Sequence, residues 1–131
     1  MSDFSLADVP AEARAHWEAL RERGELVFQR CASCGVARLP PREACPTCLS
    51  ADATWEVASG RGAVVSWVVY HRAYDPAFAA RVPYVVALVA LEEGPRMLTN
   101  VRGPQEGLAV GASVQLAVER EGELALARFA L

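Results

Sequence analysis

The sequence predicts a mainly β protein with one N-terminal helix, a small metal-binding ribbon and a five-stranded barrel. Four cysteines form two Cys-x-x-Cys pairs, and five valine- and leucine-rich runs follow them between glycine and proline turns. An amphipathic segment precedes the first cysteine. The chain has 131 residues, which suits one domain or two small ones. We expect the helix within residues 1–25, the ribbon within 26–59 and the barrel within 60–131.

The composition is that of a globular protein with an acidic balance. Hydrophobic residues make up 53% of the chain and charged residues 22%. The formal net charge is -3, and every basic residue is arginine. Binding to a nucleic-acid backbone needs a basic stripe, so it is not favoured, although a few arginines can still build a local anion pocket. No apolar run could span a membrane and the N-terminus lacks a signal-peptide pattern, so we expect a cytoplasmic protein without membrane association.

The N-terminal 25 residues have the start and stop signals of a helix. Asp8 is placed to cap it, Pro10 suits its first turn, and Gly24 suits its end. The boundaries of the helix are therefore expected near these three residues.

One face of this helix is apolar. Ala13, Trp17 and Leu20 recur at helical spacing, and most charged side chains lie elsewhere. This face either packs on the chain's own domain or docks on a partner chain. A lone helix beside a small ribbon has little core to cover, which favours a partner contact through Trp17 and Leu20. His16, next to Trp17, is expected at a solvated position.

The four cysteines predict a structural metal site. They are Cys31, Cys34, Cys45 and Cys48. Two such knuckles place four sulfurs at the corners of a tetrahedron, which is the geometry of a closed structural zinc site. A reducing compartment favours metal over two disulfides, whereas geometry alone does not separate zinc from iron.

Short strands are expected around the cysteine pairs at residues 26–30 and 54–58, and residues 37–40 lead away from the first pair. Pro40 and Pro41 force a turn before the second pair, and Trp55 is expected to cover a very small core. Because this ribbon has too little apolar surface to fold alone, metal binding would supply folding free energy on the order of 10 kcal/mol.

Five further strands are expected in the C-terminal part, at residues 64–70, 84–91, 96–101, 114–120 and 124–129. Glycine and proline turns separate them, and no second helical period interrupts them. An OB-fold, which is a five-stranded Greek-key barrel, is the expected architecture. A sandwich is the alternative, and it usually needs about seven strands.

The long connection between the first two barrel strands is the expected ligand site. The aromatic and arginine side chains expected to contact the ligand are Tyr70, Arg72, Phe78, Arg81 and Tyr84. Long loops in compact domains are often functional, and these side chains suit a ligand with an apolar arm and an anionic end. They suit a protein-docking surface equally well. A third interpretation is a loop that its aromatic residues hold against the barrel.

No catalytic residue is expected. His71 shares its loop with a tyrosine and an aspartate, but the cysteines are committed to metal and no serine lies in a Gly-x-Ser-x-Gly elbow. Dinucleotide and P-loop motifs are absent from the sequence. Gly60 and Gly62 flank an arginine, which favours a tight interdomain turn over a loop whose backbone passes close to a ligand.

Several motifs together resemble the DUF35 family, the OB-fold acyl-CoA-associated proteins with a rubredoxin-like zinc ribbon. They are Phe28-x-x-Cys31-x-x-Cys34-Gly35, Leu39-Pro-Pro-Arg42, Cys45-Pro46-x-Cys48, Trp55, Ser59-Gly-Arg-Gly62, Val64-Val-Ser-Trp67, Pro83-Tyr84, Glu93-Gly94 and Gly111-x-x-Val114. The resemblance covers nearly the whole chain. One departure is Leu49, where glycine is common in the family.

The resemblance implies a non-catalytic, acyl-CoA-binding accessory subunit whose four cysteines hold structural zinc. The implied partner is a thiolase-superfamily enzyme, such as an acyltransferase, a condensing enzyme or a steroid side-chain aldolase of lipid metabolism and steroid degradation. Related domains also pair with MaoC-like hydratase chains. No catalytic residue carries over from the family.

Three other functions stay open at this point. Zinc ribbons and OB-folds both bind single-stranded nucleic acid, although the acidic charge opposes this. A rubredoxin-like electron carrier would use the same four sulfurs for iron. An independent acyl-CoA enzyme that depends on His71 is a weaker possibility.

Overall fold

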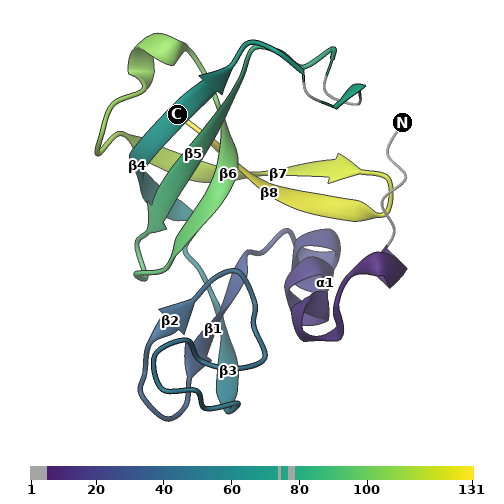
Figure 1. Ribbon diagram of the computed structural model, residues 1–131, viewed down its shortest axis with the longest axis vertical. Helices are drawn as coiled ribbons and strands as arrows, with labels where there is room; N and C mark the ends of the chain where they lie inside the picture. The colour runs from purple at the N-terminus through teal and green to yellow at the C-terminus, as the bar shows by residue number, and fades with distance from the viewer. Residues whose placement is uncertain (1–5, 74, 77–78) are drawn as a thin grey trace.

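The computed structural model describes residues 6–73, 75, 76 and 79–131, and its architecture is the expected one (Figure 1). The N-terminal elements are η1 (Leu6–Asp8), η2 (Ala11–Ala13) and α1 (Arg14–Arg23). The ribbon strands are β1 (Val27–Cys31), β2 (Ala37–Arg38) and β3 (Ala53–Val57). The barrel elements are β4 (Arg61–Tyr70), β5 (Tyr84–Leu91), β6 (Arg96–Arg102), η4 (Gln105–Gly107), β7 (Ser113–Glu121) and β8 (Leu124–Ala130).

The N-terminal helix ends as predicted and begins later than predicted. Gly24 terminates α1 in the left-handed region with a φ of 64°, where glycine carries no Cβ penalty. Asp8 does not cap α1, because it is the last residue of the separate 3-10 turn η1. Pro10 lies outside α1 as well, directly before the second turn, η2. Within the described residues, no helix has the length and apolarity that crossing a membrane would need.

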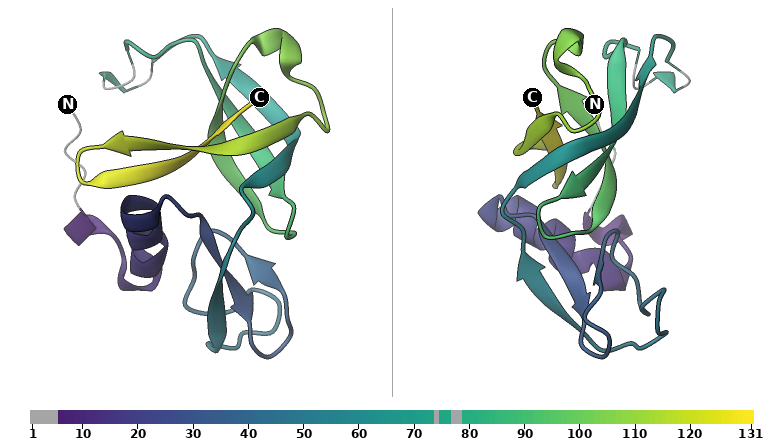
Figure 2. Two further views of the ribbon diagram at one scale, coloured as in Figure 1. Left: turned by 180° about the vertical axis from the view of Figure 1, so that it is seen from behind. Right: turned by 90° about the vertical axis from the view of Figure 1, so that its left-hand side faces the viewer.

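Helix α1 packs on the chain's own barrel, which corrects the expectation that it has little core to cover. It lies beneath the β7–β8 hairpin and contacts β8 and β1 (Figures 1 and 2). Leu20 is fully buried in the common core and is therefore closed to a partner in this fold. The sequence could not show this packing because β8 lies about a hundred residues away along the chain.

His16 is buried rather than solvated, with 7% of its surface exposed. Its ring Nδ1–H donates a hydrogen bond to the carbonyl of Val27 at 3.1 Å, which ties α1 to β1. Burial lowers the pKa of His16, and the hydrogen bond to Val27 opposes this only in part. The imidazole is therefore a neutral structural link between helix and ribbon.

The ribbon is a three-stranded antiparallel sheet in the order β2-β1-β3. Its strand β2 ends at Arg38, because Pro40 and Pro41 have no N–H to extend the pairing. A buried polar network holds the turn that follows: Gln29 Oε1 accepts hydrogen bonds from Arg38 Nε (3.0 Å) and from the Arg42 N–H (2.8 Å). Trp55 stays 38% exposed on β3, so it covers the ribbon only partly.

The C-terminal part is a closed five-stranded barrel in the order β4-β5-β6-β8-β7. All pairs are antiparallel except β6 and β8, which run parallel where Val101 meets Phe129. Burial alternates strictly along β5, as expected for a strand with one face in the barrel. The predicted OB-fold is confirmed.

One hydrophobic core joins helix, ribbon and barrel. Leu20 of α1 and Phe28 of β1 belong to the same buried cluster as Val64, Val89 and Phe129 of the barrel. The three sequence segments therefore share their apolar burial, which is the main source of folding free energy.

The link from ribbon to barrel is fixed by the β5–β6 hairpin. The Ser59 N–H donates to Glu93 Oε2 (2.6 Å), and Ser59 Oγ donates to Glu92 Oε2 (2.8 Å). Arg61 Nε also donates to Glu92 Oε2 (3.0 Å). The hydroxyl of Ser59 and then Arg61 lower the pKa of Glu92, so this carboxylate stays charged against both groups.

Gly62 is required by strand packing, and we expect Gly62→Ala to destabilise the fold. A Cβ at this position would lie 2.8 Å from the carbonyl oxygen of Ala90 and 2.8 Å from a methyl of Val89. Overpacking of this kind costs about 1–3 kcal/mol of unfolding free energy, measurable by urea denaturation. Gly107→Ala is the matched control, because its Cβ would meet only the flexible side chain of Leu131. Equal stability of the two variants would contradict the packing role.

Candidate metal centre and ligand pocket

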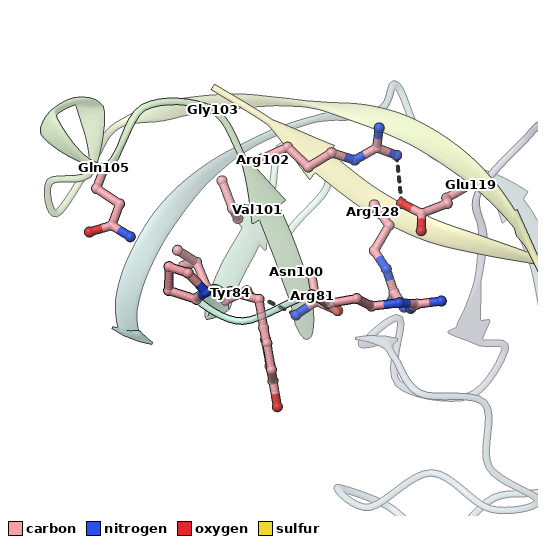
Figure 3. Close-up of a pocket in the computed structure, with 11 residues that line it drawn as sticks. Arg81, Tyr84, Asn100, Val101, Arg102, Gly103, Gln105, Glu119 and Arg128 are labelled. Atoms are coloured by element: carbon pink, nitrogen blue, oxygen red, sulfur yellow. Dashed lines mark hydrogen bonds and ion pairs between the residues drawn. The ribbon is translucent and has the colours of Figure 1, made fainter. Parts of the chain in front are cut away.

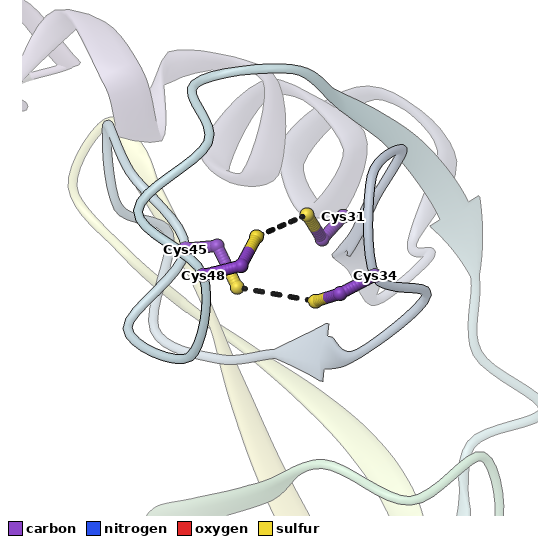
Figure 4. A group of neighbouring side chains, drawn as sticks. All are labelled: Cys31, Cys34, Cys45 and Cys48. Atoms are coloured by element: carbon purple, nitrogen blue, oxygen red, sulfur yellow. Dashed lines mark hydrogen bonds between the residues drawn. The ribbon is translucent and has the colours of Figure 1, made fainter.

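The four cysteines meet in the ribbon as the sequence predicts. All four sulfur atoms lie within 4.8 Å of one another (Figure 4). The sulfurs of Cys31 and Cys48 are 3.5 Å apart, and those of Cys34 and Cys45 are 3.6 Å apart. Cys31 and Cys45 are buried, whereas Cys34 and Cys48 lie at the surface.

Two similar backbone turns present these sulfurs. In the first, the Gly35 N–H donates to the Cys31 carbonyl (2.9 Å), and in the second the Leu49 N–H donates to the Cys45 carbonyl (2.8 Å). Gly35 has a φ of 78° and Leu49 a φ of 67°. Leu49 thus adopts the same left-handed backbone conformation as Gly35, although its side chain makes that conformation strained.

The chemistry of the four thiols fits a bound cation. Backbone N–H groups, first that of Cys48 and then that of Thr47, lower the pKa of Cys45 to about 6. For Cys48 the N–H of Ser50 lowers the pKa, but the neighbouring sulfurs, Cys31 first, outweigh it and raise the pKa to about 12. Four thiolates this close repel one another unless a metal neutralises them. The cluster is therefore a structural metal site without an open coordination position.

A second site lies at the mouth of the barrel, where a pocket of about 370 Å³ opens (Figure 3). Its polar lining comes from separate elements: Arg81 from the loop before β5, Tyr84 from β5, Asn100 and Arg102 from β6, Gln105 from η4, Glu119 from β7 and Arg128 from β8. The closure of the barrel is what brings these segments together.

The pocket contains more positive than negative side chains. Arg102 Nη2 pairs with Glu119 Oε2 at 2.8 Å, and Arg81 pairs with Glu121. Burial is the main cause that lowers the pKa of Arg128. The charges of Glu119 and Glu121 oppose this shift, and those of Arg81 and Arg102 add to it. The three guanidinium groups are therefore close enough for their positive charges to repel one another.

The structure brings together only part of the predicted ligand residues. Arg81 and Tyr84 line the pocket. Tyr70 stacks on Tyr84 with ring centroids 5.2 Å apart, outside the pocket lining. Arg72 is exposed on the loop after β4, and Phe78 lies outside the described residues.

Gly60 and Gly62 lie away from this pocket. Gly60 adopts a φ of 86° at the ribbon-to-barrel turn, and a Cβ there would press on the side chain of Leu116 at 3.2 Å. Gly62 lines a different hollow, next to Ser113 and Leu131. Gly60 thus fits the interdomain-turn interpretation, whereas Gly62 lies within β4. A ligand contact of either glycine stays a prediction.

The sequence reasoning missed Arg102, Glu119 and Arg128. Arg128 interrupts the apolar run of β8, between the buried Ala127 and Phe129. A charged residue inside an apolar strand could have suggested a functional role for Arg128. Only the barrel topology shows which side chains lie next to it.

Trp17 lines an apolar groove of about 560 Å³ between helix, ribbon and barrel. The opposite walls are Leu39 and Pro40 of the ribbon turn, Leu88 of β5 and Leu98 of β6. Leu98 is 72% exposed, which is unusual for a large apolar side chain on a strand.

His71 is exposed on the loop after β4, and His16 is committed to the helix–ribbon contact. The described residues thus place neither histidine in the barrel-mouth pocket.

Two family models match the chain. Residues 17–53 match the rubredoxin-like zinc ribbon domain of ChsH2, and residues 55–119 match its C-terminal OB-fold domain. The chain is 34% identical to a DUF35 domain-containing scaffold protein of Methanocaldococcus jannaschii, over 79% of this chain and 74% of the relative.

Two longer relatives are named as hydratase subunits. The chain is 42% identical, over 88% of its length, to a probable enoyl-CoA hydratase alpha subunit of Thermomonospora curvata. It is 41% identical, over 76% of its length, to the 3-oxo-4,17-pregnadiene-20-carboxyl-CoA hydratase alpha subunit of Mycobacterium tuberculosis. The matches cover 36% and 31% of those relatives, so the chain spans about a third of their length.

A solved structure titled Ltp2-ChsH2(DUF35) aldolase is similar over almost the whole chain. The TM-score is 0.81 at 39% identity, and the match covers 94% of this chain and 96% of the other.

Proposed function

The chain belongs to the DUF35 family of zinc-ribbon and OB-fold proteins, and we propose that it is a non-catalytic, acyl-CoA-binding subunit of a thiolase-like enzyme. The observation that supports this most is the match, over 94% of this chain, with a chain of the structure titled Ltp2-ChsH2(DUF35) aldolase, a title that names two components. In this proposal the catalytic residues lie on the partner, which is a thiolase-like aldolase, acyltransferase or condensing enzyme, and a MaoC-like hydratase is a further candidate partner.

The metal in this proposal is zinc, and its role is structural. Cys31, Cys34, Cys45 and Cys48 would fill all four positions, and the ion would join the two knuckles. Thiolate ligands need a reducing environment, which supports a cytoplasmic location. Metal analysis of the purified protein tests this assignment. We expect a colourless protein with one zinc ion per chain. A red protein with one iron per chain would indicate an electron carrier.

Assembly tests the proposed function directly. Co-expression of the chain with a thiolase-like protein encoded beside it should yield a stable complex and raise the partner's turnover of an acyl-CoA substrate. A complex with a hydratase-like protein alone would reassign the partner. No complex and no gain in activity with either protein would refute the accessory role.

The apolar groove at Trp17 is the proposed contact with the catalytic partner. We expect Leu98→Asp to abolish co-purification, because burying an unpaired carboxylate in an interface costs about 2 kcal/mol or more. Val110→Asp is the matched control, since Val110 is equally exposed but lies outside the groove. Pull-down with the tagged partner measures both. Equal loss, or no loss, in the two variants would contradict this docking surface.

A further inference from the structure

We infer that the mouth of the barrel binds the phosphate groups at the nucleotide end of the thioester, with Arg128 as the anchoring residue. The identity of the ligand as an acyl-CoA rests on the proposed function, whereas the anion site rests on the geometry of the pocket. This assigns a specific part of the ligand to this chain and leaves the acyl end to the partner.

The charge of the pocket favours an anion although the chain as a whole is acidic. Three arginines from three elements, Arg81, Arg102 and Arg128, face two carboxylates, Glu119 and Glu121. These five side chains sum to one positive charge. Guanidinium groups are the preferred protein ligands of phosphate because their N–H groups match two phosphate oxygens at once.

Arg128 is the member of this group that needs a ligand most. It is half-buried on β8, and it forms no hydrogen bond or ion pair with any residue that the structure describes. Arg81 and Arg102, by contrast, are each held by a glutamate. A partly desolvated guanidinium without such a partner gains a charge-assisted interaction when a phosphate enters, and this favours binding.

The size of the pocket indicates that it holds one end of the ligand only. At about 370 Å³ it lies near the lower limit for small-molecule sites, which is roughly 300 Å³. Tyr84, Asn100 and Gln105 supply its uncharged polar lining (Figure 3), and Asn100 Nδ2 donates to the Val85 carbonyl at 2.9 Å. That bond leaves the amide oxygen of Asn100 as an acceptor for a ligand.

Binding of defined fragments to the full, zinc-loaded chain tests the inference by calorimetry. The probes are coenzyme A, its 3′-dephospho form, adenosine 3′,5′-bisphosphate and pantetheine. We expect coenzyme A to bind and pantetheine, which has no phosphate, to fail. A loss of affinity with the 3′-dephospho form, together with binding of the bisphosphate, would assign the 3′-phosphate; equal binding of the two coenzyme forms would assign the pyrophosphate.

Variants separate the anion site from a general effect on the fold. Arg128→Met should weaken coenzyme A binding about tenfold or more, the value of a lost charge-assisted hydrogen bond. Glu119→Gln should strengthen binding, because it frees Arg102 from its ion pair. Arg96→Met is the matched control, since Arg96 is an exposed arginine of β6 outside the pocket. Zinc content and circular dichroism confirm that each variant is folded.

Several results would overturn the inference. They are equal binding of pantetheine and coenzyme A, unchanged binding by Arg128→Met, and no binding of coenzyme A at millimolar concentration. The outcome is independent of the assembly test: a chain that binds phosphate but forms no complex would refute the accessory role and leave the anion site intact.

Discussion

Cys45→Ser is expected to release the metal and unfold the ribbon. Cys45 is fully buried, and its sulfur is one of four that meet within 4.8 Å. Structural zinc contributes about 10 kcal/mol or more to the folding of small zinc domains, so no other single change should cost as much. Because Phe28 of β1 packs in the common core, the loss should extend from the ribbon into the barrel.

Zinc content after dialysis and the free energy of unfolding in urea measure this effect. Ser33→Ala is the matched control: Ser33 lies in the first knuckle, and its hydroxyl makes only an exposed hydrogen bond to Ser50 at 2.9 Å. The control should keep its zinc and its stability. If Cys45→Ser kept one zinc per chain and unfolded with the wild-type midpoint, a structural role of the metal would be refuted.

Phe28→Ala is expected to be the most destabilising change that leaves the metal ligands in place. Phe28 has no exposed surface, and its ring lies in the cluster that joins helix, ribbon and barrel. Truncating a buried phenylalanine costs about 3–5 kcal/mol through lost burial and the cavity that remains. This is a large fraction of the stability of a small domain, which is about 5–15 kcal/mol.

Urea denaturation, followed by tryptophan fluorescence and by circular dichroism, measures this loss. Val57→Ala is the control, because Val57 is an apolar residue of the neighbouring strand β3 whose side chain is 55% exposed. We expect it to cost about 1 kcal/mol or less, since little burial is lost. Similar losses in both variants would show that Phe28 is not at the junction of the core.

The elements that local sequence determines were predicted correctly. The two cysteine pairs, the five barrel strands and the helix stop at Gly24 each depend on residues a few positions apart, and the structure confirms them. Asp8 was misjudged for a local reason as well, because the chain before α1 forms two separate turns where one helix was expected.

Long-range packing was not predictable from the sequence. Whether Leu20 and His16 face solvent depends on β8 and β1, which close over the helix only in the folded chain. The ligand pocket shows the same limit. Arg81 and Tyr84 stood out in one loop, whereas Arg102 and Arg128 reach the pocket through the parallel pairing of β6 with β8.

The single core has a consequence for protein engineering. The ribbon and the barrel could be taken for separate modules that can be exchanged. However, Phe28 and Leu20 pack in the same core as the barrel residues. Glu92 and Glu93 also accept hydrogen bonds from Ser59 at the junction between ribbon and barrel. A chimera that grafts this ribbon onto the barrel of a relative at residue 60 would lose both sets of contacts. Successful recombination within the family should therefore require the helix, β1 and β8 to be inherited together.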